Sequence, residues 1–473
     1  MKKYDLIVIG GGSGGLTVAA GAASLGGKVA LIEKNNLLGG DCLHYGCVPS
    51  KTLIEAANRI YEARSLKSFG IQTSGTVDLK AVMHHVQKSI SHIQEHDDVE
   101  RFRKLGVDVY FGTGSFQSPH EVSVNDTVLY GKKIVVSTGS RPLVPEVEGL
   151  KECGFLTNES IFSLQELPQK LAVIGGGPVG VELAQAMSRL GSETTVIDRS
   201  PALFGKEDNE VGETISKLLE KEMTILTEAS VEKVEVRDGK KVLFVKRAGM
   251  LSELPVDEIL VAAGRVPNTG SLALERAGVH ADKRGHIKVN ERLESNVSHI
   301  YAVGDVNGAF PFTHAAGMEG KLVVQNALLG LRRKVSYDHV PWVIYTSPEV
   351  FHLGLTEEKA RDENSDIRVF RVPLSKVDRF VADHQTEGFV KVITDKKGKI
   401  LGAHAVGKHA GDFMQELIAA KQFNKKIGSL SNVIHPYPSH SAAVQQAADL
   451  YWRETLFEGK IQKLLERYVK WKH

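Results

Sequence analysis

The chain has 473 residues, of which 42% are hydrophobic and 25% are charged, an ordinary composition for a globular protein with about two to four domains. Its formal net charge of +2 gives no overall electrostatic attraction to nucleic acid or to an anionic membrane. Only three cysteines are present, which excludes the disulfide-rich secreted class. No apolar run is long enough for a signal peptide or a membrane span, so we expect a cytoplasmic protein.

A nucleotide-binding pattern occurs twice along the chain. An apolar strand, a Gly-x-Gly-x-x-Gly turn and a helical pattern start at Ile7–Gly15 and again at Ala172–Gly180. A second apolar run ends in an acid at Glu33 and at Asp198, in both cases 23 residues after the first glycine (33 − 10 and 198 − 175). The glycines let the backbone approach a pyrophosphate at a helix N-terminus, and the acid accepts hydrogen bonds from a ribose. Two matched copies therefore predict two Rossmann-like dinucleotide sites.

Cys42 and Cys47 follow the first of these units, with four residues between them. So short a loop gives little stabilisation as a structural staple, and in a reducing compartment an exposed pair is expected to cycle between dithiol and disulfide. A disulfide does not readily accept hydride from a nicotinamide, whereas a flavin accepts hydride and passes an electron pair to sulfur. We therefore assign FAD to the first site and NADH or NADPH to the second. Cys153 has no ligand neighbours at metal-binding spacing and is expected to be a packed thiol.

The acid of the second nucleotide-binding motif bears on the choice between NADH and NADPH. Asp198 would repel the 2′-phosphate of NADPH, so NADH is moderately favoured, although Arg199 beside it could accommodate that phosphate.

Residues 81–101 read as a helix that carries four histidines. His85, His92 and His96 fall on one face at spacings of seven and four, and His84 is adjacent. A solvated helix face is the preferred interpretation, and no resident metal site is expected in the chain.

Four further segments occur in the order typical of one enzyme family. They are Thr138–Pro142, Ala263–Asn268, Tyr301–Asp305 and Val343–Glu349. Together with the two glycine motifs and the cysteine pair, they resemble the FAD-dependent pyridine nucleotide-disulfide oxidoreductases (class I). This family includes lipoamide dehydrogenase, glutathione reductase and mercuric reductase, and the resemblance covers nearly the whole chain. It implies an α/β fold with two Rossmann-like domains, for FAD and for NAD(P), and a C-terminal α+β dimerisation domain. The implied FAD domain is discontinuous (residues 1–145 and 270–340), residues 146–269 bind NAD(P), and residues 341–473 form the dimerisation domain.

The resemblance also implies roles for individual residues. Cys47 would be the flavin-facing sulfur and Cys42 the sulfur that meets substrate, both near the start of a helix at about Pro49 whose N-terminus favours a thiolate. Lys51 would polarise the flavin ring, with Glu182 as its partner. The candidate FAD-binding residues are Gly10, Gly12, Ser13, Gly14, Gly15, Glu33, Lys34, Gly40, Asp41, Lys51, Thr113, Gly114, Thr138, Gly139, Ser140, Gly304 and Asp305, the last of which would bond the ribityl chain. The candidate NAD(P)-binding residues are Gly175, Gly177, Pro178, Val179, Gly180, Glu182, Asp198, Arg199 and Gly264.

Two positions depart from the family pattern. Asp41 stands where a threonine is usual, and a carboxylate there is electrostatically unfavourable beside a pyrophosphate unless it bonds to backbone N–H groups. Near the C-terminus, the usual histidine and glutamate that act as base and orienting carboxylate are not both present. One register puts Tyr437 at the base position, and the other puts His435 there with His440 in place of the glutamate. Neither restores a carboxylate, which argues against efficient dithiol oxidation.

Several acceptors remain open at this point. The first is an external disulfide, small or protein-bound. The second is a soft metal ion, because a tyrosine at the base position resembles mercuric reductase, although that enzyme's C-terminal cysteine pair is missing here. Oxidation of a dihydrolipoamide-type dithiol and a redox-sensing or electron-delivery role are further alternatives. The family implies a homodimer, and no nucleic-acid partner is expected.

The last residues extend beyond the usual end of the family. Phe457, Ile461, Leu464, Leu465 and Tyr468 are expected on one face of a helix whose other face is basic. We expect this tail to pack on its own or the partner subunit, or to dock to an acidic membrane surface or another protein.

Overall fold

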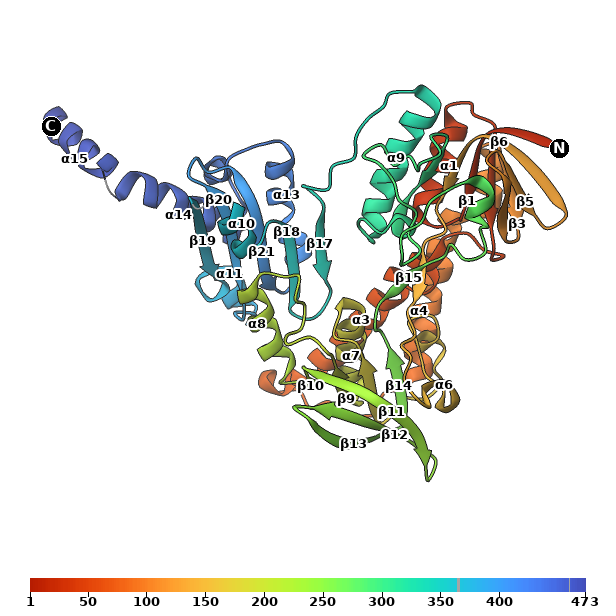
Figure 1. Cartoon of the computed structure of the whole chain (residues 1–473). Helices are drawn as coiled ribbons and strands as arrows, with labels where there is room; N and C mark the ends of the chain where they lie inside the picture. The colour runs from red at the N-terminus through yellow and green to blue at the C-terminus, as the bar shows by residue number, and fades with distance from the viewer. Residues whose placement is uncertain (364–365, 459) are drawn as a thin grey trace. The chain divides into compact units, whose positions relative to one another are not determined.

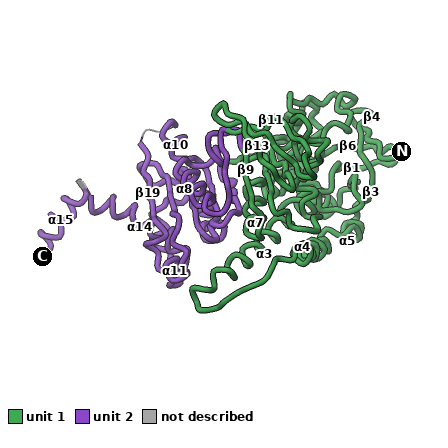
Figure 2. The backbone as a smooth tube through the Cα atoms, turned by 90° about the horizontal axis from the view of Figure 1, so that it is seen from below, with its two compact units in different colours: residues 1–197, 229–337 green, residues 198–228, 338–473 purple. Residues whose placement is uncertain are grey.

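The computed structural model of the chain describes residues 1–363, 366–458 and 460–473. These residues form two compact units, coloured separately in Figure 2: Met1–Ile197 with Ala229–Tyr337, and Asp198–Glu228 with Asp338–His473. The second unit thus takes a segment out of the stretch expected to bind NAD(P). The three-domain division expected from the sequence stays a prediction.

The largest sheet of the first unit is built mainly from parallel strands. Its order is β3 (Val107–Phe111), β2 (Val29–Glu33), β1 (Lys2–Ile9), β6 (Thr127–Val136), β5 (Glu121–Val124) and β4 (Gly114–Ser118), with β16 (Ile300–Ala302) also beside β6. β1 runs parallel to β2 and β6, whereas β4 and β5 form an antiparallel hairpin next to β6. β2 is buried along its whole length, as expected for a parallel strand that is covered on both faces.

Two helices cover one face of this sheet. α1 (Ser13–Ser24) follows the first glycine turn and packs beside α9 (Thr313–Leu329) (Figure 1). Ala19 and Ala22 of α1 share a buried cluster with Val323 and Val324 of α9 and with apolar residues of β1 and β2. Small residues on α1 allow this close contact with α9. The contact fixes the position of the N-terminus of α1, directly after the glycine turn.

The remaining strands of the first unit form smaller sheets. One parallel group contains β9 (Glu193–Ile197), β8 (Lys170–Ile174) and β14 (Glu258–Val261). A separate antiparallel sheet contains β11 (Ala229–Arg237), β12 (Lys240–Arg247) and β13 (Met250–Val256). β7 (Ser140–Pro142) and β15 (Arg265–Pro267) make a short antiparallel pair. The helices of this unit also include α2 (Gly40–His44), α3 (Cys47–Ser65), α4 (Leu79–Gln94), α5 (Val99–Lys104), α6 (Leu150–Cys153) and α7 (Pro178–Leu190). Cys153, the third cysteine, is half-buried at the end of α6.

α3 and α7 lie side by side in the same direction. The guanidinium of Arg64, near the end of α3, donates a hydrogen bond of 2.8 Å to the carbonyl of Arg189 near the end of α7. Lys51 and Glu182 pair in a corresponding way near the two helix starts. This packing brings the helix after the cysteine pair against the helix after the second glycine turn.

The single long helix expected over residues 81–101 is wrong. α4 ends at Gln94, a short 3-10 turn covers Glu95–Asp97, and α5 starts after Asp98, whose carboxylate accepts the N–H of Glu100 as an N-cap. His96 therefore lies outside α4 and does not continue the face of His85 and His92. The histidines of this segment are exposed, as the solvated-face interpretation requires.

The second unit contains an antiparallel sheet with helices, as expected for the C-terminal region. Its strand order is β17 (Pro341–Ile344), β18 (Glu349–Gly354), β21 (Ile400–Gly407), β20 (Phe389–Asp395) and β19 (Ile367–Pro373). Its other elements are α8 (Asn209–Leu219), β10 (Thr224–Leu226), α10 (Glu357–Glu363), α11 (Asp378–Ala382), α12 (Ala410–Phe413), α13 (Gln415–Gln422), α14 (Ala442–Phe457) and α15 (Lys460–Lys472). A core that includes Phe351, Phe370, Phe380 and Tyr451 fills the space between one face of the sheet and helices α11 to α14.

The C-terminal tail is two helices rather than one. α14 ends at Phe457 and α15 begins at Lys460, so Phe457 does not continue the apolar face of α15 (Figure 1). Gly459, between them, lies outside the described residues. Leu464 is 68% exposed and Trp471 is 81% exposed, so the packing expected for this tail is not seen among the residues that the structure describes. Among the described residues, no helix combines the length and the apolar character needed to cross a bilayer.

Candidate active site

The cysteine loop is tied to the first glycine turn. Gly39 donates its N–H to the carbonyl of Gly11 at 2.9 Å. Gly40 has a positive φ of 63°, and a Cβ at this position would lie 2.7 Å from the Cα of Gly12. Only glycine fits this approach, so the loop that carries the cysteines is held against the turn that is expected to receive a pyrophosphate.

Cys42 and Cys47 occupy two different helices. Cys42 is half-buried in α2, and Cys47 is exposed as the first residue of α3, two residues before the expected start near Pro49. The hydrogen bond from the Cys42 thiol lowers the pKa of Cys47 to about 6, helped by the Thr313 hydroxyl and the charge of Lys51. The same pairing, together with burial, raises the pKa of Cys42. In the dithiol form the proton therefore stays on Cys42 and the thiolate is Cys47.

Lys51 and Glu182 form an ion pair within the first unit. Lys51 Nζ lies 2.6 Å from Glu182 Oε2, and the side chain of Glu182 is only 6% exposed. Lys51 is one helical turn after Cys47 on α3, so its ammonium is held close to the reactive sulfur by a carboxylate from α7. Residues 131 positions apart in the chain are thus brought together, as the resemblance implied.

Both glycine turns have the same steric design. Gly10 and Gly175 have φ values of 110° and 118°, and a Cβ on them would lie 2.2 Å and 2.4 Å from the carbonyl oxygens of Ser137 and Ala262. A Cβ at Gly15 or Gly180 would lie about 2 Å from the carbonyl of the first glycine of its own turn. The described backbone therefore requires glycine at both ends of each motif, which is the geometry of a dinucleotide cradle.

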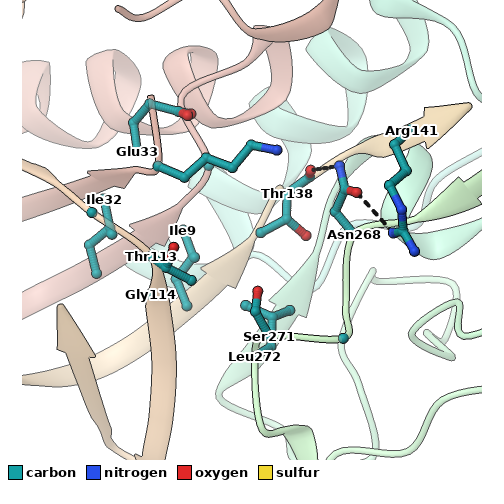
Figure 3. A pocket seen from close by; sticks show the side chains of 14 residues that line it. Ile9, Ile32, Glu33, Thr113, Gly114, Thr138, Arg141, Asn268, Ser271 and Leu272 are labelled. Atoms are coloured by element: carbon teal, nitrogen blue, oxygen red, sulfur yellow. Dashed lines mark hydrogen bonds between the residues drawn. The ribbon is translucent and has the colours of Figure 1, made fainter. Parts of the chain in front are cut away.

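A cavity of about 290 Å³ extends from the first glycine turn (Figure 3). Six of the expected FAD residues line it: Gly10, Glu33, Lys34, Thr113, Gly114 and Thr138. On one side, Asn268 donates to the carbonyl of Thr138 at 3.0 Å and accepts from Arg141 at 3.2 Å. The Thr138 hydroxyl oxygen is buried and has no hydrogen-bond partner among the described residues. An unpaired polar atom and an acid at the end of β2 suit a ribose and its base, so these residues fit the adenosine part of FAD.

Glu33 is held in place before any ligand binds. Its carboxylate accepts the N–H of Gly11 at 2.7 Å and that of Asn35 at 2.9 Å, and the residue is 6% exposed. These bonds aim it along the glycine turn, where a ribose hydroxyl is expected.

Asp41 has a partner that local sequence did not reveal. Arg265, at the start of β15, lies 3.1 Å from the Asp41 carboxylate and donates to the Ser140 hydroxyl at 2.7 Å. The Ser140 hydroxyl in turn donates to Asp305 at 2.5 Å. A guanidinium from a distant strand therefore compensates the charge of Asp41, in place of the backbone N–H groups that were expected to do so. Asn158 contributes a longer contact of 3.4 Å.

Glu319 fixes the loop that carries Asp305 and was not expected from the sequence. It is fully buried on α9, where its carboxylate accepts the N–H of Gly304 at 2.7 Å, the Asn307 amide at 2.9 Å and the Tyr337 hydroxyl at 2.5 Å. Burial raises the pKa of Glu319 in spite of these donors. Glu319 is the single acid of α9, and a lone acid among mostly apolar and small residues is the signal that could have found it.

The second glycine turn leads into α7, whose first residues are among those expected to bind NAD(P). Pro178 is the first residue of α7, and Val179 is exposed beside it. Gly264, with a φ of 134°, follows β14. In the second unit, Asp198 comes directly after β9 in the chain and accepts the N–H of Ser200 at 2.7 Å. Arg199 is the next residue.

Each candidate acid or base near the C-terminus has a carboxylate partner in the second unit. His435 Nε2 lies 3.0 Å from Glu416, His440 Nε2 lies 2.9 Å from Asp383, and the Tyr437 hydroxyl donates to Asp378 at 2.8 Å. Neither register of the short motif restores a carboxylate, yet the fold supplies one to each histidine. The carboxylates come from 19 and 57 residues upstream, where a search for a glutamate in the same short motif could not find them. Tyr437 is 81% exposed, whereas the His435 side chain is 8% exposed.

Comparison with known proteins agrees with this geometry. Residues 4–320 match the family model "Pyridine nucleotide-disulphide oxidoreductase", and residues 340–448 match its dimerisation domain. The chain belongs to this family. A mercuric reductase from Staphylococcus aureus is 35% identical over 94% of this chain and 82% of its own, and a mitochondrial dihydrolipoyl dehydrogenase from Pisum sativum is 36% identical over 94% and 91%. The Cu(II) complex of the HOCl-induced flavoprotein disulfide reductase RclA from Escherichia coli superimposes with a TM-score of 0.86 at 27% identity, covering 95% of this chain and 100% of the other.

Membership of the family confirms the main predictions from the sequence. The fold class is that of two nucleotide-binding domains with a C-terminal dimerisation domain. The protein is an FAD-dependent oxidoreductase that uses a pyridine nucleotide. The bound flavin supplies the relay of an electron pair between the nicotinamide and the cysteine pair. The residues described above are expected to bind and orient the nucleotides and to determine which sulfur carries the negative charge.

The pH dependence of the reduced enzyme should report the Cys47 thiolate. Because the pKa of Cys47 is lowered to about 6, the thiolate–flavin charge-transfer absorbance should be full at pH 8 and fall with a midpoint near pH 6. In Lys51→Met the midpoint should move to higher pH, since a cation that favours the thiolate is removed. An anaerobic absorbance titration measures both midpoints. Equal midpoints in the two proteins would contradict the assigned role of Lys51.

Proposed function

We propose that this enzyme uses NADH to reduce an external disulfide, either small or protein-bound. The observation that carries the proposal is the cysteine pair at two helix starts, with Cys47 as the stabilised thiolate and Cys42 as the protonated partner. Deprotonated Cys42 attacks the external disulfide, forms a mixed disulfide and releases the first thiolate. Cys47 then attacks Cys42, releases the second thiolate and restores the Cys42–Cys47 disulfide. Each released thiolate takes up one proton.

The proton on Cys42 has to be removed before this attack. A histidine paired with a carboxylate is a suitable base, because the carboxylate orients the ring and stabilises its charged form. His435 with Glu416 and His440 with Asp383 both have this arrangement. Tyr437 is not available as a base at neutral pH, because its bond to Asp378 raises the pKa of a phenol that is already protonated there, and it is better suited to contact the acceptor. We infer a homodimer from the dimerisation domain, in which these residues serve the partner's cysteine pair.

An anaerobic titration with NADH, and separately with NADPH, tests the proposal. NADH should bleach the flavin at lower concentration, because the Asp198 carboxylate repels a 2′-phosphate, and a long-wavelength band should appear as the disulfide opens. Bleaching without this band would reject electron transfer to the cysteine pair. A preference for NADPH would instead assign Arg199 to the 2′-phosphate.

Reduction of a soft metal ion is the second candidate. It is favoured by the 35% identity to mercuric reductase and by a tyrosine at position 437. Hg(II)-dependent oxidation of NADPH in excess thiol would support it, whereas turnover only with disulfides would support the first candidate. The histidine–carboxylate pairs also remove the main objection to oxidation of a dihydrolipoamide-type dithiol, which the same assay run with NAD⁺ and dihydrolipoamide would detect. A redox-sensing or electron-delivery role predicts no steady turnover with any diffusible acceptor.

The α15 helix is proposed to dock on an anionic surface in the cytoplasm. Ile461, Leu464, Tyr468 and Trp471 are exposed on it, and its sequence Lys460–Lys472 carries several cations.

Deletion of residues 456–473 should abolish cosedimentation with vesicles that contain phosphatidylserine and leave FAD content unchanged. Neutral phosphatidylcholine vesicles are the control. Equal binding by the full chain and the deletion variant would reject this docking role.

A further inference from the structure

A row of polar side chains crosses the buried face of the sheet in the second unit. Cross-strand pairing places Trp342 opposite His352, His352 opposite His404, His404 opposite Lys391, and Lys391 opposite Arg371. Paired residues on neighbouring strands point to the same face of a sheet. His352, His404 and Lys391 are at most 4% exposed, so this row needs buried partners.

The segment before α8 supplies those partners. Asp208 caps α8 and lies 2.9 Å from Lys391, which also lies 2.6 Å from Glu357. Glu207, the preceding residue, contacts His352 and Trp342 rather than Lys391. Its Oε2 lies 2.7 Å from His352 Nδ1, and its Oε1 accepts the indole N–H of Trp342 at 2.7 Å. Among the described residues, Glu207 forms no ion pair with lysine or arginine.

Both imidazoles turn the same nitrogen to a backbone carbonyl. His352 Nε2 lies 2.9 Å from the carbonyl of Gly354, and His404 Nε2 lies 2.9 Å from that of Leu355. A carbonyl oxygen can only accept, so each Nε2 carries a proton and each Nδ1 presents a lone pair in the neutral ring.

One of the ring nitrogens at the centre of this cluster has no hydrogen-bond partner among the residues that the structure describes. His404 Nδ1 is buried, and nothing in the described chain bonds to it. His352 Nδ1 faces a carboxylate oxygen, which is also an acceptor. One ring nitrogen of each histidine and one Glu207 oxygen all lie within 4.8 Å of one another. A tetrahedral ion with bonds of about 2.0–2.1 Å needs ligand atoms about 3.4 Å apart, so small shifts would close the site.

We propose that Glu207, His352 and His404 bind a zinc-type divalent cation at a buried structural site. Two imidazoles and one carboxylate are a donor set that suits zinc. The surrounding bonds are those of a metal site, since each imidazole donates its other N–H to a carbonyl and the carboxylate is oriented by an indole. The ion would fasten the segment that carries Glu207 to β18 and β21. No motif spacing reveals this site, because its ligands come from three distant positions.

The test measures zinc directly in the FAD-loaded full chain. A Cys42→Ser/Cys47→Ser background is used, so that zinc cannot bind at the dithiol, and zinc sulfate is supplied during expression because the site is buried. After dialysis, we expect about one zinc per chain by elemental analysis. The X-ray absorption spectrum should show a nitrogen and oxygen shell at about 2.0–2.1 Å.

Variants in the same background separate this site from others. Glu207→Gln keeps an oxygen for Trp342 but removes the ligand charge, and should weaken zinc binding by about 100-fold. His384→Asn is the matched control: it alters an exposed histidine of the same unit, at a left-handed φ of 54° that asparagine tolerates, and should retain the zinc. Absence of zinc from the parent protein, or a sulfur shell near about 2.3 Å, would overturn the proposal and leave a buried Glu207–His352 ion pair only. These parent measurements decide the question even if Glu207→Gln fails to fold.

Discussion

Replacement of Cys47 by serine should lower disulfide-reductase turnover by at least about 1,000-fold, because the sulfur that exchanges electrons with the flavin is removed. The long-wavelength charge-transfer band should be absent at every pH, since serine does not ionise in the accessible range. FAD content should stay at the parent level, because Cys47 is exposed and does not line the described adenosine cavity. Stopped-flow reduction with NADH under anaerobic conditions measures the loss of the band and of turnover together.

Cys42→Ser is the matched control for this experiment. It should lose turnover to a similar extent, because no sulfur remains to attack the external disulfide. It should nevertheless keep the charge-transfer band in the oxidised enzyme, since the Cys47 thiolate is free of its disulfide partner and a serine hydroxyl can still donate to it. The opposite result, with the band retained in Cys47→Ser and lost in Cys42→Ser, would exchange the roles of the two sulfurs.

Replacement of Glu319 by alanine should destabilise the first unit by about 3 kcal/mol and weaken FAD retention. The change leaves three donors without their acceptor, on the buried Gly304 and on the half-buried Asn307 and Tyr337. The Gly304 N–H belongs to the loop that positions Asp305. The substitution should therefore disorder the segment that is expected to bind the ribityl chain of FAD. Urea unfolding of the holoenzyme and flavin fluorescence after dilution measure the two effects.

Glu319→Gln distinguishes hydrogen bonding from charge. Its amide oxygen can accept from Gly304 and Asn307, and its NH₂ can donate to the Tyr337 oxygen, so it imitates the protonated acid that burial favours. We expect less than about 1 kcal/mol of destabilisation and normal FAD content. If glutamine were as damaging as alanine, the negative charge itself would be required, and the proposed hydrogen-bonding role would fail.

The sequence predicted the parts of the site whose chemistry is local. The geometry of each glycine motif can be predicted from the sequence, because the turn, the helix start and the following strand are consecutive in the chain. Cys42 and Cys47 were recognisable for the same reason. Lys51 and Glu182 are 131 residues apart and could be paired only through the family resemblance. The physical cause of that pairing, the parallel packing of α3 against α7, is a property of the folded chain.

The features that sequence reasoning missed all depend on partners from distant segments. Asp41 looked unfavourable until Arg265 was found beside it. His435 looked unoriented until Glu416 on α13 was found. Glu319 is the single acid of α9, and the ligands of the proposed zinc site come from three separate elements. A search for conserved spacing cannot detect such contacts, because strand order and helix packing set them rather than sequence distance.

The contact between Arg265 and Asp41 limits how segments of this enzyme can be exchanged with those of its relatives. A chimera that receives residues 39–51 from an enzyme with threonine at position 41 keeps both cysteines and Lys51, yet removes one of the two carboxylates beside the Arg265 guanidinium. Arg265 would then be left with Asp305, the residue expected to bond the ribityl chain, and would compete with the cofactor for it. Loop and strand therefore form one transferable module, and position 265 has to be exchanged together with position 41.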